Sequence, residues 1–399
     1  MFEVYPMSLN ETVSADRVHI AFFGRRNAGK SSVVNAVTNQ NMSVVSAYKG
    51  TTTDPVKKAM ELLPLGPVVI TDTAGFDDEG ELGALRVEKT REILRRTDMA
   101  VLVVDAQLGL GVAENELIKE FSDRKLPYLI AYNKCDLLSH RAELPENALY
   151  VSAVTKEGIN TLKERLALLL KERPAERKIV ADMMRGDTAV LVIPVDESAP
   201  KGRLILPQQL TIRELLDHHK TVVCCQPEEL STMLSNMKEK PAIVITDSQA
   251  FERVSADTPE DILLTSFSIL FARYKGSLHM LLNGARAIDT LSDGDRVLIA
   301  EGCTHHRQCN DIGSVKMPRW IEDFTGKKPV YEFSSGVGYP ENLSRYKLIV
   351  HCGGCMLNEK EMQYRMKAAK QAGVPVVNYG MAIAHMHGIL RRALQPFDI

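Results

Sequence analysis

The sequence lacks any apolar run that approaches the roughly 20 residues of a membrane-spanning helix, so we expect no transmembrane segment. It also lacks the charged-then-apolar N-terminal pattern of a secretory signal. Its seven cysteines are an odd number, which favours reduced thiols or metal ligands over a disulfide framework. From these absences we predict a cytoplasmic protein that does not associate with membranes.

The sequence has no strong excess of charge of either sign: the formal net charge is -2 and the pI is near 6.6. No global basic field therefore favours nucleic acid as a partner. Aromatic residues are scarce at 6%, and the 45% hydrophobic and 25% charged fractions are typical of a soluble globular protein. At 399 residues the chain is too long for one ordinary core, so two or three domains are expected.

A glycine-bounded segment at residues 24–31 reads Gly-Arg-Arg-Asn-Ala-Gly-Lys-Ser and lies between an apolar run at 18–23, typical of a buried strand, and a helix-compatible segment. This is the context of a phosphate loop, in which backbone N–H groups and a helix N-terminus bind phosphate oxygens. Lys30 is expected to reach the β- and γ-phosphates, and the Ser31 hydroxyl to bind Mg²⁺. The loop residues predicted to contact the nucleotide are Gly24, Asn27, Ala28, Gly29, Lys30, Ser31 and Ser32.

Apolar runs alternate with amphipathic helical patterns through the first part of the chain. The runs lie at 68–72, 99–105 and 128–133, and the helical patterns at 82–97, 113–124 and 159–170. This alternation predicts a doubly wound α/β domain over residues 1–172 with a mostly parallel sheet. Its ligand is expected at the carboxyl ends of the strands.

The loops after these strands carry further nucleotide-binding motifs. Asp72 follows one strand and can reach Mg²⁺ through water, while the amide of Gly75 is expected to face the γ-phosphate. Asp136 can accept two hydrogen bonds from guanine that adenine cannot offer, and residues 151–153 are expected to supply an amide to the guanine carbonyl. The predicted base-binding residues are Asn133, Lys134, Asp136, Ser152 and Ala153.

The order and spacing of these motifs resemble those of small G proteins. Phe76 stands where Ras-like proteins place the glutamine that orients the attacking water. Together, Asn27 and the segment 50–54 resemble the potassium-activated GTPases of the TrmE–Era group. The resemblance implies slow hydrolysis in which K⁺ on Asn27 replaces an arginine finger, although an ordinary loop role for Asn27 stays open.

The same resemblance implies a switch threonine that binds Mg²⁺. Thr52 is the candidate, and its neighbours Thr51 and Thr53 leave the choice open. The implied catalytic residues are Asn27, Lys30, Thr52 and Gly75.

The middle of the chain, residues 173–266, shows apolar runs and helical spacing but no catalytic constellation. Strands are predicted at 188–195, 221–225 and 242–246, and helices at 212–219 and 227–237. A small α/β unit without a site of its own suggests an interaction domain, and dimerisation is our hypothesis for it.

The last part, residues 267–399, again alternates, with strands predicted at 295–300, 346–350 and 376–379 and helices at 359–371 and 381–394. Cys303 and His305 follow the first strand, and His351, Cys352 and Cys355 follow the second. Because carboxyl ends of parallel strands share one edge, we expect the two loops to converge.

Three thiolates with one or two imidazoles are soft ligands that suit zinc or an iron–sulfur cluster. A structural zinc site stays open, and Cys309 could compete with Cys303. A thioredoxin-like function of Cys352 and Cys355 would leave Cys303 and two histidines unused. A set of three cysteines leaves one iron with an exchangeable ligand.

A TrmE-type GTPase joined to this Cys-x-His and His-Cys-x-x-Cys pattern resembles the FeFe-hydrogenase maturation GTPases, the HydF family. Residues 304–306, 311–313 and 316–319 resemble that family around its first cysteine. The resemblance implies three domains, with dimerisation through the middle one and a dimer or a dimer of dimers overall. It also implies a 4Fe–4S cluster on Cys303, Cys352 and Cys355, with His305 or His351 as candidate fourth ligand.

By the same resemblance, the protein is expected to be a scaffold and carrier for the two-iron precursor of the hydrogenase active site. Its implied partners are apo FeFe-hydrogenase and the radical-SAM maturases HydE and HydG. The competing hypothesis is an Era- or Der-like RNA or ribosome-assembly GTPase with a structural metal. The near-neutral charge and the lack of a basic Gly-x-x-Gly loop weigh against it.

Overall fold

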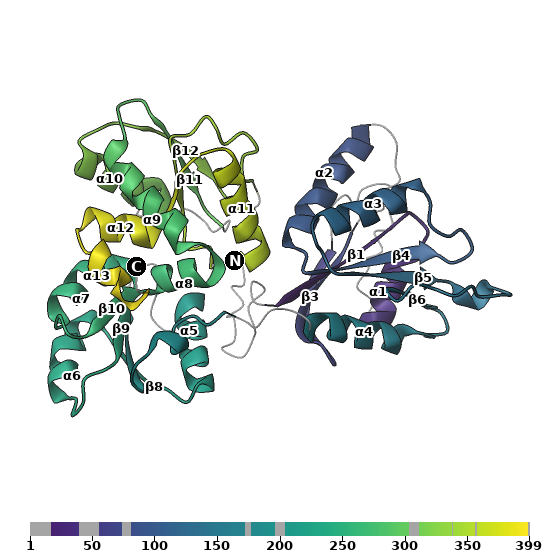
Figure 1. Cartoon of the computed structure of the whole chain (residues 1–399), viewed down its shortest axis with the longest axis horizontal. Helices are drawn as coiled ribbons and strands as arrows, with labels where there is room; N and C mark the ends of the chain where they lie inside the picture. Colours follow the sequence, from purple (N-terminus) through teal and green to yellow (C-terminus); the bar gives the residue numbers. More distant parts are fainter. Residues whose placement is uncertain are drawn as a thin grey trace, which may run out of the picture. The chain divides into compact units, whose positions relative to one another are not determined.

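The computed structural model describes residues 17–39, 56–73, 81–171, 177–195, 204–302, 311–336, 338–355 and 357–397 (Figure 1). The side chains of 81–88 and 171 are not described. The chain divides into two compact units, Met1–Ala175 and Glu176–Ile399. No helix among these residues is both long enough and apolar enough to cross a bilayer.

The first unit contains a six-stranded sheet in the order β2-β3-β1-β4-β5-β6, parallel except for the β2–β3 pair. Its strands are β1 (Val18–Gly24), β2 (Val56–Leu62), β3 (Gly66–Asp72), β4 (Met99–Asp105), β5 (Tyr128–Asn133) and β6 (Ala148–Tyr150). Its helices are α1 (Lys30–Thr38), α2 (Glu81–Arg96), α3 (Val112–Asp123) and α4 (Ile159–Lys171).

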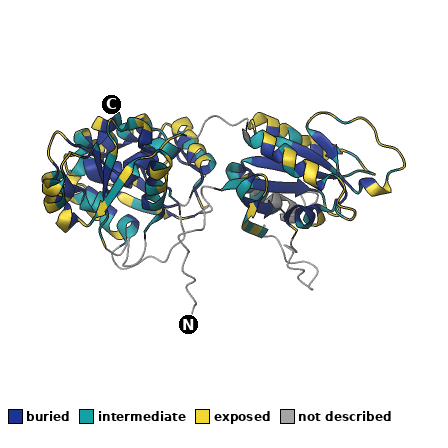
Figure 2. Cartoon of the chain, turned by 90° about the horizontal axis from the view of Figure 1, so that it is seen from below, coloured by how far each residue is buried: buried dark blue, intermediate teal, exposed yellow. Residues whose placement is uncertain are grey.

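Successive side chains of a strand point to opposite faces of the sheet, and here both faces carry apolar side chains. Helices therefore cover both faces. On β1, Ile20 and Phe22 pack with α1 and α4, whereas Ala21 and Phe23 pack with α2 and α3. Figure 2 shows the central strands buried and the exposed residues gathered on the surrounding helices and loops. The predicted α/β fold with an N-terminal phosphate-loop domain is therefore confirmed.

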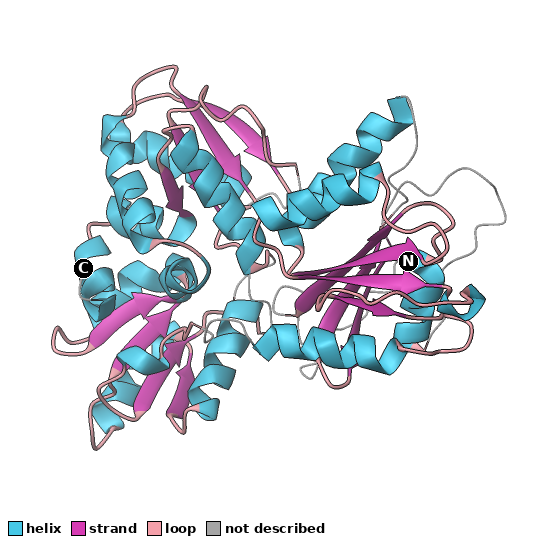
Figure 3. Ribbon diagram, turned by 45° about the vertical axis from the view of Figure 1, so that its right-hand side comes forward, coloured by secondary structure: helices cyan, strands magenta, loops and turns pink. Residues whose placement is uncertain are grey.

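The second unit contains two four-stranded parallel sheets, β10-β9-β7-β8 and β12-β11-β13-β14 (Figure 3). The first is built from β7 (Thr188–Val192), β8 (Thr221–Cys225), β9 (Ile243–Thr246) and β10 (Leu263–Ser266), with α5 (Leu206–Asp217), α6 (Leu230–Asn236), α7 (Phe251–Asp257) and α8 (Phe267–Lys275). The second is built from β11 (Arg296–Ala300), β12 (Val330–Ser334), β13 (Leu348–His351) and β14 (Val376–Asn378), with α9 (Leu278–Ala287), α10 (Met317–Thr325), α11 (Glu359–Gln371), α12 (Tyr379–Met386) and α13 (Leu390–Leu394).

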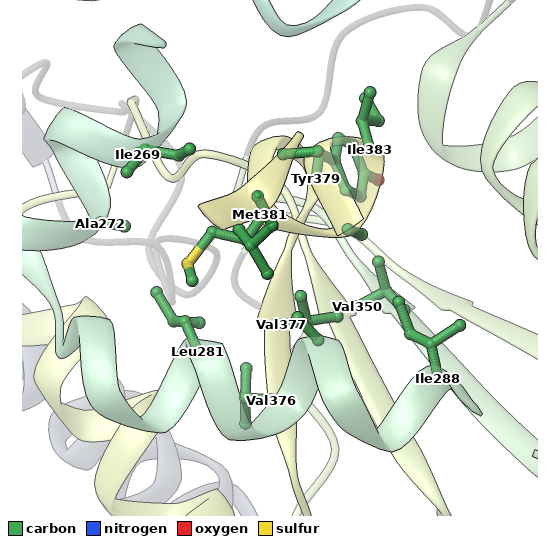
Figure 4. Close-up of a cluster of buried hydrophobic side chains, with 14 of the residues drawn as sticks. Ile269, Ala272, Leu281, Ile288, Val350, Val376, Val377, Tyr379, Met381 and Ile383 are labelled. Carbon is green, nitrogen blue, oxygen red and sulfur yellow. The ribbon is translucent and has the colours of Figure 1, made fainter. Parts of the chain in front are cut away.

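One hydrophobic core joins these two sheets. Ile269 and Ala272 of α8 lie with Leu281 of α9 against Val376 and Met381 of the second sheet and its helix (Figure 4). The same cluster includes Val190, Val192, Val244 and Leu264 of the first sheet. The predicted middle and C-terminal parts therefore fold against each other as one compact unit, and the predicted domain boundary at residues 266 and 267 falls at the junction of β10 and α8.

One predicted helix is wrong in its extent. The pattern at 381–394 predicted a single helix, but the structure has α12 and α13 with a break between Met386 and Leu390. Gly388 lies in that break with φ 73°, a left-handed conformation that ends helices and that glycine adopts without steric penalty.

Candidate nucleotide and metal sites

The phosphate loop connects β1 to α1 and turns through two left-handed residues, Asn27 (φ 66°) and Gly29 (φ 80°). A Cβ atom on Gly29 would lie 2.3 Å from Asn133 Nδ2, so no other residue fits there without displacing that side chain. The Gly29 carbonyl accepts the first helical hydrogen bond, from Val33 N at 2.9 Å. The loop therefore ends at a helix N-terminus, the arrangement that binds phosphate.

The expected phosphate and magnesium ligands lie together at the carboxyl ends of β1 and β3. Lys30 Nζ forms an ion pair with Asp72 Oδ1, and Ser31 Oγ donates to Asp72 Oδ2 at 2.6 Å. Lys30 is 9% exposed, so its ammonium is held inside the site. Lys30, Ser31 and Asp72 therefore lie within hydrogen-bonding distance of one another, and their roles at the phosphates and Mg²⁺ stay predictions.

Asn133 organises the base-binding side of the site. Its Nδ2 donates to the carbonyl of Ala28 at 3.0 Å, and its Oδ1 accepts from the amide of Ala153 at 3.1 Å. The side chain is buried, so this bridge fixes the phosphate loop against residues 151–153. Asp136 is exposed on the short 3₁₀ turn after β5, which leaves its carboxylate accessible to a base.

The backbone amides that were expected to contact guanine already donate to other acceptors in this structure. Ser152 N donates to the Glu157 carbonyl at 3.0 Å, and Ala153 N donates to Asn133. A guanine carbonyl would have to share one of these donors. Lys134, at φ 66°, ion-pairs with Asp105 at 2.6 Å, which holds its stem beside the site.

An ion pair that sequence reasoning missed ties the phosphate loop to α3. Arg25 Nη2 lies 2.5 Å from Glu114 Oε2, and the same carboxylate accepts the Gly111 amide at 3.0 Å. Glu114 is 2% exposed. The available signal was its position three residues after the helix N-cap, where a glutamate carboxylate can accept a hydrogen bond from the N-cap amide.

Several predicted site residues lie outside the described part of the chain. They are Thr51, Thr52, Thr53, Gly75, Phe76, Cys303, His305 and Cys309. Their predicted roles stay predictions.

The two cysteine-bearing loops start at the carboxyl ends of β11 and β13, which are neighbouring strands of the second sheet in the second unit. Ala300 of β11 pairs in register with His351 of β13. The Gly302 amide donates to Cys352 Sγ at 3.1 Å, and the Gly354 amide donates to the same sulfur at 3.4 Å. The segment leading to Cys303 is thus in direct contact with Cys352, as the parallel sheet predicted.

The two described cysteines in the loop after β13, Cys352 and Cys355, suit metal binding. Cys352 and Cys355 are both half-buried. Gly354 has φ 65°, and a Cβ there would lie 2.7 Å from Met362 Sδ, so the turn requires glycine. Among the described residues no three His, Cys, Asp or Glu side chains form a metal-binding group, and the third predicted cysteine is not one of those residues.

His351 is already engaged at both ring nitrogens. Nδ1 donates to the Cys352 carbonyl at 2.7 Å, and Nε2 accepts from Arg365 Nη1 at 3.1 Å. Burial and the Arg365 charge lower the pKa of His351 to about 3, so the ring is neutral. Iron could bind this ring only after one of these bonds breaks, which weighs against His351 as fourth ligand.

Arg365 is the second residue that sequence reasoning missed. It is 1% exposed, and its Nε donates to Glu361 Oε1 at 2.9 Å. Nη2 donates to the Gly336 carbonyl at 2.5 Å, and the guanidinium lies 4.8 Å from the centre of the Tyr339 ring. Arg365 thus connects α11, the end of β13 and the loop after β12.

Comparison with known protein families adds a second line of evidence. The hydrogen maturase F dimerization domain matches residues 179–276, and the hydrogen maturase F tetramerization domain matches 279–396. A 50S ribosome-binding GTPase family matches residues 19–134, and the elongation factor Tu GTP-binding domain matches 86–223.

Individual relatives resemble part of the chain. The tRNA modification GTPase MnmE of Xanthomonas euvesicatoria pv. vesicatoria is 36% identical over 155 residues, which are 39% of this chain and 34% of that protein. MnmE of Chromobacterium violaceum is 34% identical over 178 residues, 43% of this chain and 39% of that protein. The chain thus spans well under half the length of these relatives. A variant of Aquifex aeolicus Era bound to GDP.AlF4- aligns at 22% identity and TM-score 0.34, covering 40% of this chain and 57% of Era.

The two maturase domains together account for more than half of the chain and follow a GTPase domain. On this evidence the chain belongs to the hydrogen maturase F (HydF) family.

Proposed function

We propose that this protein is a GTP-hydrolysing scaffold that holds a 4Fe–4S cluster on Cys303, Cys352 and Cys355. It assembles or delivers the two-iron precursor of the FeFe-hydrogenase active site, with apo-hydrogenase and the maturases HydE and HydG as partners. It forms a dimer through the middle domain, or a dimer of dimers with the C-terminal domain. GTP hydrolysis on the first unit regulates its encounters with these partners.

The observation that carries the cluster proposal is the hydrogen bond from Gly302 N to Cys352 Sγ at 3.1 Å. It supports convergence of the loop that leads to Cys303 with the loop that holds Cys352 and Cys355. N–H donors on a sulfur stabilise its thiolate form and are among the features that set cluster potentials. Three thiolates fit a cluster, and the cluster would supply one iron with an exchangeable coordination position.

The family matches favour hydrogenase maturation over RNA binding. The ribosome-binding GTPase family covers only 19–134, whereas the maturase domains match 179–276 and 279–396. Guanine selectivity is assigned to Asp136, phosphate binding to Lys30, and Mg²⁺ binding to Ser31 together with Asp72 and Thr52. The Lys30–Asp72 ion pair and the Ser31–Asp72 hydrogen bond support the phosphate and Mg²⁺ parts of this assignment.

Removing any one of the three cysteines should abolish the cluster but leave GTP hydrolysis largely intact. Cys303→Ala, Cys352→Ala and Cys355→Ala each remove one of the three proposed thiolate ligands, whereas the nucleotide side chains lie in a separate compact unit. Anaerobic reconstitution with iron and sulfide, followed by metal and sulfide analysis and EPR of the reduced protein, measures the first effect. Phosphate release measures the second.

Cys224→Ala is the matched control, because Cys224 is an exposed free thiol on β8 and belongs to neither loop. It should take up as much iron as the wild type. A folded wild-type protein that carries zinc and gives no EPR signal after reconstitution would rule out the cluster.

The potassium role proposed for Asn27 can be separated from its backbone role. Asparagine is tolerated at φ 66°, so the loop conformation alone could explain this residue. In Asn27→Gly the backbone conformation stays accessible while the side-chain oxygen is lost. We expect equal hydrolysis rates in KCl and NaCl for this variant, with the KCl rate lowered about 10²-fold, since a transition-state charge loses its stabilising group.

Asn39→Gly is the control for this measurement. Asn39 is also left-handed, at φ 52°, but it lies at the C-terminal end of α1, away from the phosphate loop. Its variant should keep the difference between KCl and NaCl. Equal and negligible wild-type rates in both salts would refute the role of Asn27.

A further inference from the structure

A buried lysine that the nucleotide site does not use contacts the loop that carries Cys355. Lys275 is the last residue of α8 and is 2% exposed. Its Nζ donates to the Leu357 carbonyl at 3.0 Å and to the Cys355 carbonyl at 3.3 Å. The ammonium also lies 5.6 Å from the centre of the Phe271 ring.

The helix that carries this lysine is firmly held by both sheets of the second unit. Phe267 and Phe271 are buried in the core beneath the first sheet. At the other end of α8, Asn378 Nδ2 at the end of β14 donates to the Ser268 carbonyl at 2.9 Å. Because α8 is fixed by these contacts, the position of Lys275 Nζ is set by the fold rather than by the cysteine loop.

This contact also links two segments of the chain that match different domain families. Lys275 falls in the segment matched by the dimerization domain, 179–276, and Cys355 falls in the segment matched by the tetramerization domain, 279–396. The two hydrogen bonds therefore attach the metal-binding turn of one domain to the last helix of the other.

A buried ammonium is costly unless it is hydrogen-bonded, and charge-assisted bonds to carbonyls are stronger than neutral ones. Here the bonds fix backbone groups at and two residues beyond a predicted thiolate ligand. A positive charge near thiolates stabilises their deprotonated form and, in a cluster site, the more negative reduced state.

We propose that Lys275 is a positioning residue for the metal site. It holds the carbonyls of Cys355 and Leu357 in place for metal binding and puts a positive charge beside the backbone of one predicted thiolate ligand. This inference rests on the cluster proposed above, but the ordering of the turn can be measured without metal.

Lys275→Met removes the charge and the donors while keeping the length of the side chain. In the metal-free full-length protein, amide hydrogen exchange at Gly354 and Leu357 should become about tenfold faster, because the turn loses two hydrogen bonds that oppose its opening. After reconstitution, iron content should fall and the reduction potential of the remaining cluster should become more negative. Lys275→Arg keeps the charge and should restore most of the potential.

Arg273→Met is the matched control, because it removes a cation from the same helix. Arg273 is partly exposed and pairs with Asp182 at 2.5 Å, away from the cysteine turn. This variant should match the wild type in exchange at Gly354 and Leu357 and in reduction potential.

Exchange and potential that are unchanged in Lys275→Met would overturn the proposal, as would a potential shift of equal size in Arg273→Met. If Lys275→Met fails to fold, the same two measurements are made on Lys275→Gln, with the same expected and contradicting results. A wild-type protein that takes up no cluster would instead overturn the proposed function, and amide exchange would still decide whether Lys275 orders the turn.

Discussion

Replacement of Arg365 by methionine should destabilise the second unit by about 3–5 kcal/mol, the usual effect of removing one partner from a buried ion pair. Glu361 is 3% exposed and would keep a carboxylate that lacks its guanidinium partner. The Gly336 carbonyl and His351 Nε2 would each lose a donor as well. Urea unfolding followed by tryptophan fluorescence measures this effect, because the single tryptophan, Trp320, lies on α10 of the same unit.

Two further variants test the physical cause. Lys367→Met removes an exposed cation from the same helix and should change the free energy of unfolding by under about 0.5 kcal/mol. The double variant Glu361→Met, Arg365→Met removes the buried carboxylate together with its guanidinium partner, so it should be more stable than Arg365→Met alone. If the double variant is no more stable than Arg365→Met, the lost free energy of unfolding comes from packing and from the other hydrogen bonds of Arg365.

The regular elements of this protein were largely predictable because their sequences are locally consistent. The strands at Met99–Asp105 and Tyr128–Asn133 and the helix at Glu359–Gln371 have the bounds that their patterns predict. The strand β2 was missed because its residues alternate between half-buried and exposed at a sheet edge, so Lys57 and Lys58 obscure the apolar period. The strand β12 is likewise an edge strand, with few buried side chains.

The residues that organise the two sites were less predictable than the motifs themselves. Lys30, Asp72 and Asn133 belong to motifs whose spacing indicates their chemistry. In the structure Lys30 pairs with Asp72, and Asn133 bonds to the Ala28 carbonyl of the phosphate loop. Arg365 lies in a helix with several charged residues, where a charged side chain normally faces solvent. Its burial depends on Gly336 and Tyr339, which are distant in sequence, so only the folded chain reveals it.

The arrangement of the second unit explains how a site on one domain can depend on another. The hydrophobic core passes through α8 and α9 from the first sheet to the second. Lys275 at the end of α8 contacts the cysteine turn, and Asn378 at the end of β14 contacts the start of the same helix. A change in the middle domain that moved α8 would therefore also move the turn that holds Cys355.

Lys30→Met should lower GTP hydrolysis by at least about 10²–10³-fold, the range observed when one preorganised charge-stabilising group is removed from a transition state. Methionine keeps most of the length of the side chain but cannot neutralise the β- and γ-phosphates. Steady-state phosphate release at saturating GTP measures the change. Arg26→Met, which removes an exposed cation from the same loop, is the control and should stay within a few-fold of the wild type.

The same variant should lose activity without a comparable loss of stability. Asp72 is 12% exposed and would still accept the Ser31 hydroxyl, so it would not be left as an isolated buried charge. Urea unfolding followed by circular dichroism should therefore show a first unit that is nearly as stable as the wild type. If Lys30→Met instead unfolds this unit, the Lys30–Asp72 pair is primarily structural. If the variant is folded and hydrolyses GTP at the wild-type rate, the predicted role of Lys30 at the phosphates is wrong.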